Sequence, residues 1–355
     1  MFRRLIKLKK VEELIEMKKL IIIFLAVACI VPNFAGDKSR KGTTGADQLL
    51  VPVGARGIAT GEAFLSSITG LEALFYNPAG FAHTTGSEAM FSYMTYIADI
   101  NVSYFAIGTN LGDLGSFAFS IKTFDIGDIP VTTFDAPDGD GSTYSPGFLT
   151  AGLSYAKVIT DRVSVGVNAK VISETILDAN ATGFAVDFGV QYRFNNNLTL
   201  GAAVKNIGTN MAYSGSNLQV NTGIPGTLPG SKDGVFEVVA EPFQIPSYFE
   251  LAVGYAYDIN EQNMLQVAST FRNNNALEDQ MKFGLEYGFN QMFFLRAGYD
   301  LLLENTNQNT FGFTAGAGVN YQLSDGINVV LDYAFREVKE FPTANHIFTV
   351  KLGLE

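Results

Sequence analysis

The chain contains 355 residues, of which 47% are hydrophobic and 17% are charged, and its formal net charge is −11. The charged fraction lies well below the roughly 25% of an ordinary soluble domain, and the aromatic and aliphatic content excludes a disordered chain. The acidic balance argues against a nucleic-acid partner. The single cysteine excludes zinc sites, redox CxxC pairs and disulfide frameworks, so we expect no metal and no cofactor.

Residues 1–35 have the features of an export signal with an upstream extension. Met17 and two lysines precede an apolar run that is shorter than the roughly 20 residues a transmembrane helix needs. Met17 is therefore a candidate start of translation, and we expect cleavage after Ala35. A rival interpretation is a lipoprotein-like box at residues 26–29, in which Cys29 would carry a lipid.

Residues 36–87 are expected to form a plug. Residues 43–86 show no strand-like alternation, residues 61–74 favour a short helix, and the Asn77-Pro78 pair is a turn signal. Because this segment is long and precedes the first predicted strand, it can fold back into the interior of a barrel formed by residues 88–355.

The remainder of the chain alternates with a period of two, which indicates strands. In residues 163–171, every odd-numbered position is apolar and every even-numbered position is polar or glycine. We count about fourteen such segments, each close to the length of a membrane-spanning strand. They cover residues 88–98, 101–109, 114–125, 145–158, 162–173, 182–194, 198–206, 246–258, 262–272, 278–289, 291–302, 309–322, 326–338 and 344–354.

The connections between these segments alternate in length, as expected for an antiparallel outer-membrane barrel with short turns at one end and long loops at the other. The connections predicted to be long cover residues 126–144, 174–181, 207–245 and 339–343, whereas the first hairpin, at residues 99–100, is short. One face of each strand is aliphatic or aromatic and should meet lipid; the other carries glycine, small polar residues and scattered charges. The alternative, a soluble all-β protein, would leave that apolar face in water, where it would promote aggregation.

The plug segment resembles a known family. The run Val-Pro-Val-Gly-Ala-Arg-Gly-Ile-Ala at residues 51–59, Gly-Glu-Ala at 61–63 and Tyr-Asn-Pro-Ala-Gly at 76–80 are similar to the start of PorV/PorQ proteins. These are fourteen-stranded outer-membrane barrels related to the FadL fatty-acid channel, and the Asn-Pro-Ala element also resembles FadL-type plugs. The resemblance does not decide between the PorV-like and PorQ-like branches.

The resemblance implies a non-enzymatic barrel of a protein-secretion apparatus of the type IX kind. Its partners would be outer-membrane lipid, a large secretion barrel and exported proteins with a C-terminal sorting domain. The alternative is a FadL-like passive transporter of long-chain fatty acids or other hydrophobic small molecules. That function needs an apolar pocket and a lateral exit, for which Pro146-Gly147 is a candidate because proline removes a ladder donor. The largely polar or glycine inward face weighs against it.

Two sets of candidate site residues follow from this reasoning. The plug motif comprises Gly54, Arg56, Gly57, Asn77, Pro78 and Ala79. The candidate lumen charges are Lys170, Asp187, Arg193, Glu250, Glu286, Arg296, Asp300 and Asp332, joined by Lys205, Lys282 and Arg336.

We expect Asn77 and Pro78 to seal the lumen through turn hydrogen bonds, with a simple turn as the alternative. Arg56 is expected to pair with one of the lumen carboxylates named above, with a solvated arginine as the alternative. Because the inward charges have both signs, a lumen that holds the plug and neutralises itself is favoured over an ion-selective one. The apolar residues of the long loop at 207–245 favour a lid or a partner-binding surface.

Overall fold

The computed structural model describes residues 42–226, 228, 232–304, 309–324 and 326–354. The proposed signal segment at residues 1–35, with Cys29, lies outside the described residues. No helix in the described part of the chain is long and apolar enough to cross a membrane.

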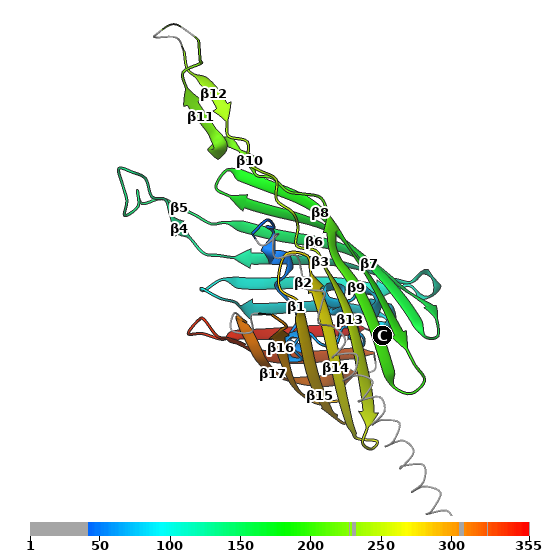
Figure 1. The fold of residues 1–355 in the computed structure, drawn as a ribbon. Helices are drawn as coiled ribbons and strands as arrows, with labels where there is room; N and C mark the ends of the chain where they lie inside the picture. Colours follow the sequence, from blue (N-terminus) through cyan, green and yellow to red (C-terminus); the bar gives the residue numbers. More distant parts are fainter. Residues whose placement is uncertain (1–41, 227, 229–231, 305–308, 325, 355) are drawn as a thin grey trace, which may run out of the picture.

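Fourteen antiparallel strands of the described chain close into a barrel (Figure 1). Each strand pairs with the next barrel strand along the chain, and the register from Ser87 opposite Leu354 to Thr95 opposite His346 joins the last strand to the first. The strands are β1 (Ser87–Thr95), β2 (Asn101–Asn110), β3 (Ser116–Asp125), β6 (Gly147–Thr160), β7 (Val163–Ile176), β8 (Ala179–Arg193), β9 (Leu198–Gly208), β13 (Tyr248–Asp258), β14 (Asn263–Asn274), β15 (Gln280–Phe289), β16 (Phe293–Leu302), β17 (Phe311–Ser324), β18 (Ile327–Val338) and β19 (Asn345–Leu354).

The fold class is confirmed, and each predicted strand corresponds to one barrel strand. The inward and outward faces also follow the alternation: Ser164, Asn168 and Lys170 are buried, whereas Leu153 and Phe348 are exposed on the outside of the barrel. This arrangement is the inverse of a soluble barrel and places the apolar side chains where lipid would solvate them.

One connection differs from the prediction. Residues 174–181 were expected to form a longer loop, but β7 continues to Ile176 and β8 begins at Ala179, which leaves a two-residue turn. Thr175 and Asn180 are paired across the ladder. The Thr175 hydroxyl also donates a hydrogen bond to the Asn180 Oδ1 at 2.8 Å, which stabilises this extension of the two strands. Polar residues near a hairpin tip therefore belong to the sheet here.

The two ends of the barrel differ, and we name them by their connections. The turn end, where β1 begins and β19 ends, has short connections; the loop end carries the long segments 126–146 and 209–247. The first contains β4 (Ile129–Pro130) and β5 (Thr143–Tyr144). The second contains β10 (Ser214–Gly215), β11 (Gln219–Thr222) and β12 (Gly234–Glu237), and its β11–β12 hairpin stands away from the barrel (Figure 1).

Residues 42–86 lie inside the barrel as a plug of short helices and turns. They include η2 (Asp47–Leu49), α2 (Ala55–Ala59), α3 (Ala73–Tyr76) and η3 (Pro78–His83). Helix α2 packs against β16, β17, β18 and β19, whereas η3 packs against β6, β7 and β8. The plug therefore touches opposite parts of the wall and fills the space between them.

Candidate functional site in the barrel lumen

The glycines of the plug motif allow close packing around Glu72. Gly54 precedes α2 at φ +82°, a conformation that favours glycine, and a Cβ there would lie 2.2 Å from the Glu72 carboxylate. The Gly57 N–H donates to Glu72 Oε1 at 2.7 Å, and the Tyr76 hydroxyl donates to the Val53 carbonyl at 2.9 Å. The motif thus brings α2 against α3, with a buried carboxylate between them.

Asn77 joins the plug to the barrel wall. It ends α3 and begins η3, where its Oδ1 accepts from the Ala79 N–H at 3.2 Å and Pro78 occupies the first helical position. Its Nδ2 donates to the carbonyls of Leu65, at 3.1 Å, and of Val190 in β8, at 3.0 Å. Asn77 therefore makes a turn and, in addition, a hydrogen bond between plug and wall.

Inward-facing glycines form the wall surface on which the plug backbone rests. A Cβ on Gly298 would lie 2.2 Å from the Gly61 nitrogen, and one on Gly166 would lie 2.3 Å from the Pro78 carbonyl carbon. Real Cβ atoms do not approach backbone so closely, so any side chain at these positions would push the plug away. The glycines that meet plug backbone in this way are Gly166, Gly201, Gly284 and Gly298, and a Cβ at Gly189 or Gly316 would meet plug side chains.

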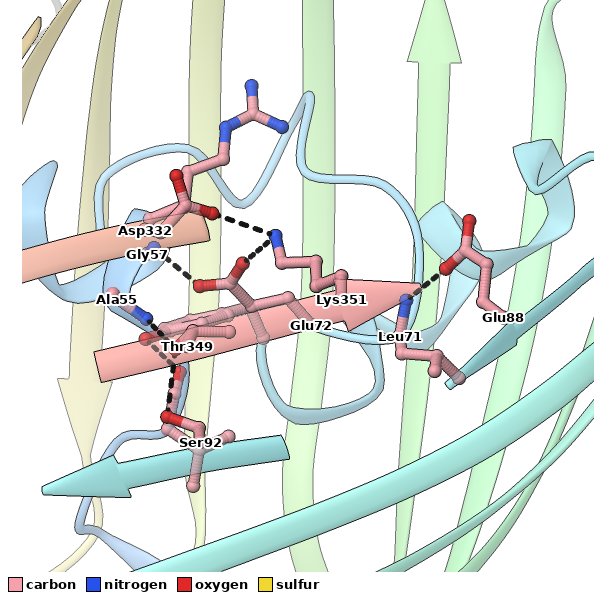
Figure 2. A network of polar contacts seen from close by, with 12 residues as sticks. Ala55, Gly57, Leu71, Glu72, Glu88, Ser92, Asp332, Thr349 and Lys351 are labelled. Carbon is pink, nitrogen blue, oxygen red and sulfur yellow. Dashed lines mark hydrogen bonds and ion pairs between the residues drawn. The ribbon is translucent and has the colours of Figure 1, made fainter. Parts of the chain in front are cut away.

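Ion pairs form a first network between the plug and the strands, which we call the Glu286 network. The Arg56 guanidinium binds Glu286 in β15 through two hydrogen bonds of 2.9 and 2.8 Å. Lys351 in β19 binds Glu72 at 2.7 Å and approaches Asp332 at 3.4 Å (Figure 2). The network has three cations and three carboxylates: Arg56, Arg296, Lys351, Glu72, Glu286 and Asp332.

A second network, the Glu62 network, surrounds a single plug carboxylate. Glu62 lies 2.6 Å from Lys282, 3.0 Å from Arg272 and 3.8 Å from Arg336. This network also has three cations and three carboxylates: Glu62, Glu250, Asp300, Arg272, Lys282 and Arg336.

The cations of this network determine the protonation state of Glu62. Burial by itself raises the pKa of Glu62, but the nearby Lys282, Arg272 and Arg336 outweigh burial and hold that pKa well below its ordinary value of 4.5. Glu62 is therefore an anion at neutral pH and neutralises cations of three strands.

A third group of charges, the lysine cluster, lies beside Phe75, with Lys122 and Lys205 over its ring. It consists of Lys122, Lys170 and Lys205 with Asp187. Asp187 lies 2.7 Å from the Lys170 Nζ and 3.8 Å from the Lys205 Nζ, and Lys205 also donates to the Phe75 carbonyl. The Lys122 Nζ donates to the Val51 carbonyl at 2.9 Å.

Most of the predicted lumen charges meet within these groups, but Arg193 does not. Arg193 ends β8 at the turn end of the barrel and belongs to none of the three groups. Arg56 is paired with Glu286, one of the five carboxylates considered as its partner. Sequence reasoning missed charged residues that the structure places in the groups: Glu62, Glu72, Lys122, Arg272 and Lys351. Lys122, Arg272 and Lys351 occupy inward-facing positions of strands, so the alternation could have identified these three residues.

The barrel wall is irregular between β8 and β9, not at Pro146-Gly147. Gly147 pairs with both Asp125 and Thr175, so the ladder is continuous there and the predicted gap is absent. Between β8 and β9, by contrast, the register shifts beside Asp187, and Asn206 adopts φ +58°. This is a β-bulge, which bends the bulged strand and increases its twist.

An apolar cluster lies beside this bulge at the loop end, where the inward face was expected to be polar. Met211 and Ile245, from the base of the 209–247 segment, pack on Ile172 of β7 and on the start of the plug. Phe243 and Met211 exchange two backbone hydrogen bonds, which fix this base. The cluster comprises Ala46, Leu49, Ile172, Ala181, Ala185, Met211 and Ile245.

These features define a class: a closed fourteen-stranded barrel with an apolar outer face and an internal plug, the architecture of FadL-type outer-membrane barrels. No protein-family model matches the chain, and no curated relative matches its sequence. Among solved structures, the chain is similar to the CymD monoaromatic hydrocarbon channel, with 12% identity, a TM-score of 0.55 and coverage of 86% of this chain and 98% of the other.

The chain is also similar in structure to the toluene transporter TbuX of Ralstonia pickettii, with 12% identity, a TM-score of 0.52 and coverage of 86% and 98%. A FadL homologue of Pseudomonas aeruginosa aligns with 12% identity, a TM-score of 0.51 and the same coverage. At this identity the likeness establishes the fold alone.

Proposed function

We propose that this chain is a non-enzymatic outer-membrane channel that admits hydrophobic small molecules from the extracellular side, which would be the loop end of the barrel. The observation that carries the proposal is the apolar cluster at the loop end. It is a buried apolar site at the end of the barrel where an extracellular ligand would enter, and such a site suits an apolar ligand. Two of the similar structures are a monoaromatic hydrocarbon channel and a toluene transporter, which supports this ligand class.

In this proposal the structure represents a closed state. Hydrophobic molecules would enter between Met211, Ile245 and Ile172, and the docked plug would block the route toward the turn end. The bulge between β8 and β9 lies next to this cluster and interrupts the ladder there, so a lateral exit through the wall would open at this seam. Either plug movement or wall opening would complete the passage.

The proposal predicts that a charge in the apolar cluster slows uptake. Gram-negative cells that lack their own channels should take up labelled toluene several-fold faster when they express this chain. The Met211→Asp variant should return uptake close to the background, because Met211 is buried in the cluster and an unpaired buried carboxylate is costly. The measurement is initial uptake rate, normalised to the amount of folded barrel in the outer membrane.

Phe134→Asp is the matched control, because Phe134 is fully exposed on the other long segment of the loop end. It should leave toluene uptake unchanged. Uptake that is equal in cells with and without the wild-type chain would contradict the channel proposal.

A role in protein secretion is the second candidate, and one observation favours it. The β11–β12 hairpin stands away from the barrel and exposes Val220, Val235 and Phe236, which a purely solvated loop would not need. We would test it by affinity capture from gently solubilised outer membranes. Recovery of a large barrel protein, or of exported proteins that share a C-terminal domain, would support secretion; a barrel recovered alone would count against it.

A further inference from the structure

The lysine cluster differs from the two ion-pair networks in its charge. The Glu286 and Glu62 networks each contain three cations and three carboxylates, so both are neutral. The lysine cluster has three lysine amino groups and, among the described residues, one carboxylate within ion-pair distance, that of Asp187. All three lysines are buried. Buried charges without counter-ions are costly, so a further negative charge beside these lysines would stabilise their protonated form.

Lys122 is the lysine of this cluster that lacks a carboxylate partner among the described residues. Its Nζ donates to the Val51 carbonyl and lies 4.9 Å from the centre of the Phe75 ring. Lys205 lies over the same ring, at 4.6 Å. A carbonyl and an aromatic face stabilise an ammonium group, but neither carries the full charge of a counter-ion.

A cavity of about 30 Å³ lies beside this cluster. Lys122, Lys170 and Thr150 contribute donors to its lining, and Gly152 leaves part of the wall without a side chain. The Asp187 carboxylate and the Asn168 amide also line the cavity. The Thr150 hydroxyl is buried and has no hydrogen-bond partner. Since a single water needs about 10–15 Å³ measured in this way, the space suits a compact group rather than a drug-sized ligand.

We propose that this cavity binds one small monovalent anion, either a halide or a short carboxylate of acetate size. The anion accepts hydrogen bonds from the Thr150 hydroxyl and from the ammonium groups of Lys122 and Lys170, and it supplies the further negative charge. The site borders the apolar cluster, since Leu49 belongs to both, but the anion is bound by different side chains. Anion binding can therefore be tested without any measurement of transport.

The test uses the full-length protein in detergent, with sodium bromide as the probe. Crystals grown with bromide should show an anomalous bromine peak between Lys122 and Thr150, and excess acetate should displace it if the site also takes carboxylates. Bromide should also raise the melting temperature relative to sodium sulfate at equal ionic strength, because a ligand bound to the native state stabilises it.

Thr150→Val should weaken bromide binding by about tenfold while it leaves the barrel folded, because the substitution removes an unpaired hydroxyl and conserves shape. Gly152→Ala is a second variant that fills the cavity, since its Cβ would meet the side chains of Asn168 and Ser120 at 2.8 and 2.9 Å. Thr123→Val is the control, because Thr123 follows Lys122 on β3 and takes the outward-facing position. A cavity without bromide, together with a melting temperature that is the same in bromide and sulfate, would overturn the proposal.

Discussion

Glu62→Gln is expected to release the plug and to convert a closed barrel into one with frequent large openings. The substitution leaves Arg272, Lys282 and Arg336 with too little negative charge, and breaking a buried ion pair from one side costs about 3–5 kcal/mol. The wall strands keep their ladders, so this cost falls on the docking of the plug. Single-channel recording in planar bilayers should show rare openings for the wild type and many for the variant.

Glu88→Gln is the matched control for this experiment. Glu88 accepts one hydrogen bond from the Leu71 N–H, at 3.1 Å, and a glutamine oxygen can still accept it. The control should therefore behave as the wild type does. Equal conductance in Glu62→Gln and the wild type would show that Glu62 does not hold the plug.

The pH dependence of plug docking follows from the sign of the Glu62 pKa shift. Because the pKa is lower in the folded state, the ion pairs stabilise docking fully above the ordinary value of 4.5. That stabilisation is lost only as the pH falls through the folded pKa, which lies below 4.5. We expect wild-type conductance to stay low from neutral pH down to about 4.5 and to rise in more acidic buffer, with no such transition in Glu62→Gln.

The barrel was predictable because its signal is local. Alternation fixes the face of every residue in a strand, so the inward positions of Gly166, Asn168 and Lys170 follow from counting by two. The same rule fails where the strand geometry is irregular. The bulge beside Asp187 depends on tertiary packing, whereas Pro146 looked irregular in sequence but precedes a strand that pairs regularly at its start.

The partners inside the lumen were not predictable, because they are set by contacts between distant parts of the chain. Glu62 and Arg272 are 210 positions apart, and nothing in the local sequence of either residue selects the other. Alternation shows that Gly298 faces inward but not that the backbone of Gly61 rests on it. The apolar cluster was missed for a related reason, since Met211 reaches it from a loop that has no periodicity.

Gly298→Val is the second substitution expected to have a large effect, and it acts by shape instead of charge. Its Cβ would lie 2.2 Å from the Gly61 nitrogen, and a backbone atom in a turn at φ +63° cannot move aside as a flexible side chain can. Overpacking typically costs about 1–3 kcal/mol and sometimes more. Valine suits a strand, so β16 should remain paired while the plug is displaced. Hydrogen–deuterium exchange should then show at least a tenfold loss of protection for amides of residues 55–65.

Gly353→Val provides the comparison that isolates the plug contact. Gly353 alternates with the outward-facing Leu352 and Leu354 on β19, but the nearest atom to its Cβ position is 3.7 Å away and belongs to Asn328 of the neighbouring strand, not to the plug. Plug protection should be unchanged in this variant, and barrel strands should stay protected in both. If Gly298→Val kept the plug as protected as the wild type does, the glycine surface would not be what allows the plug to dock, and its close approach to the wall would need another explanation.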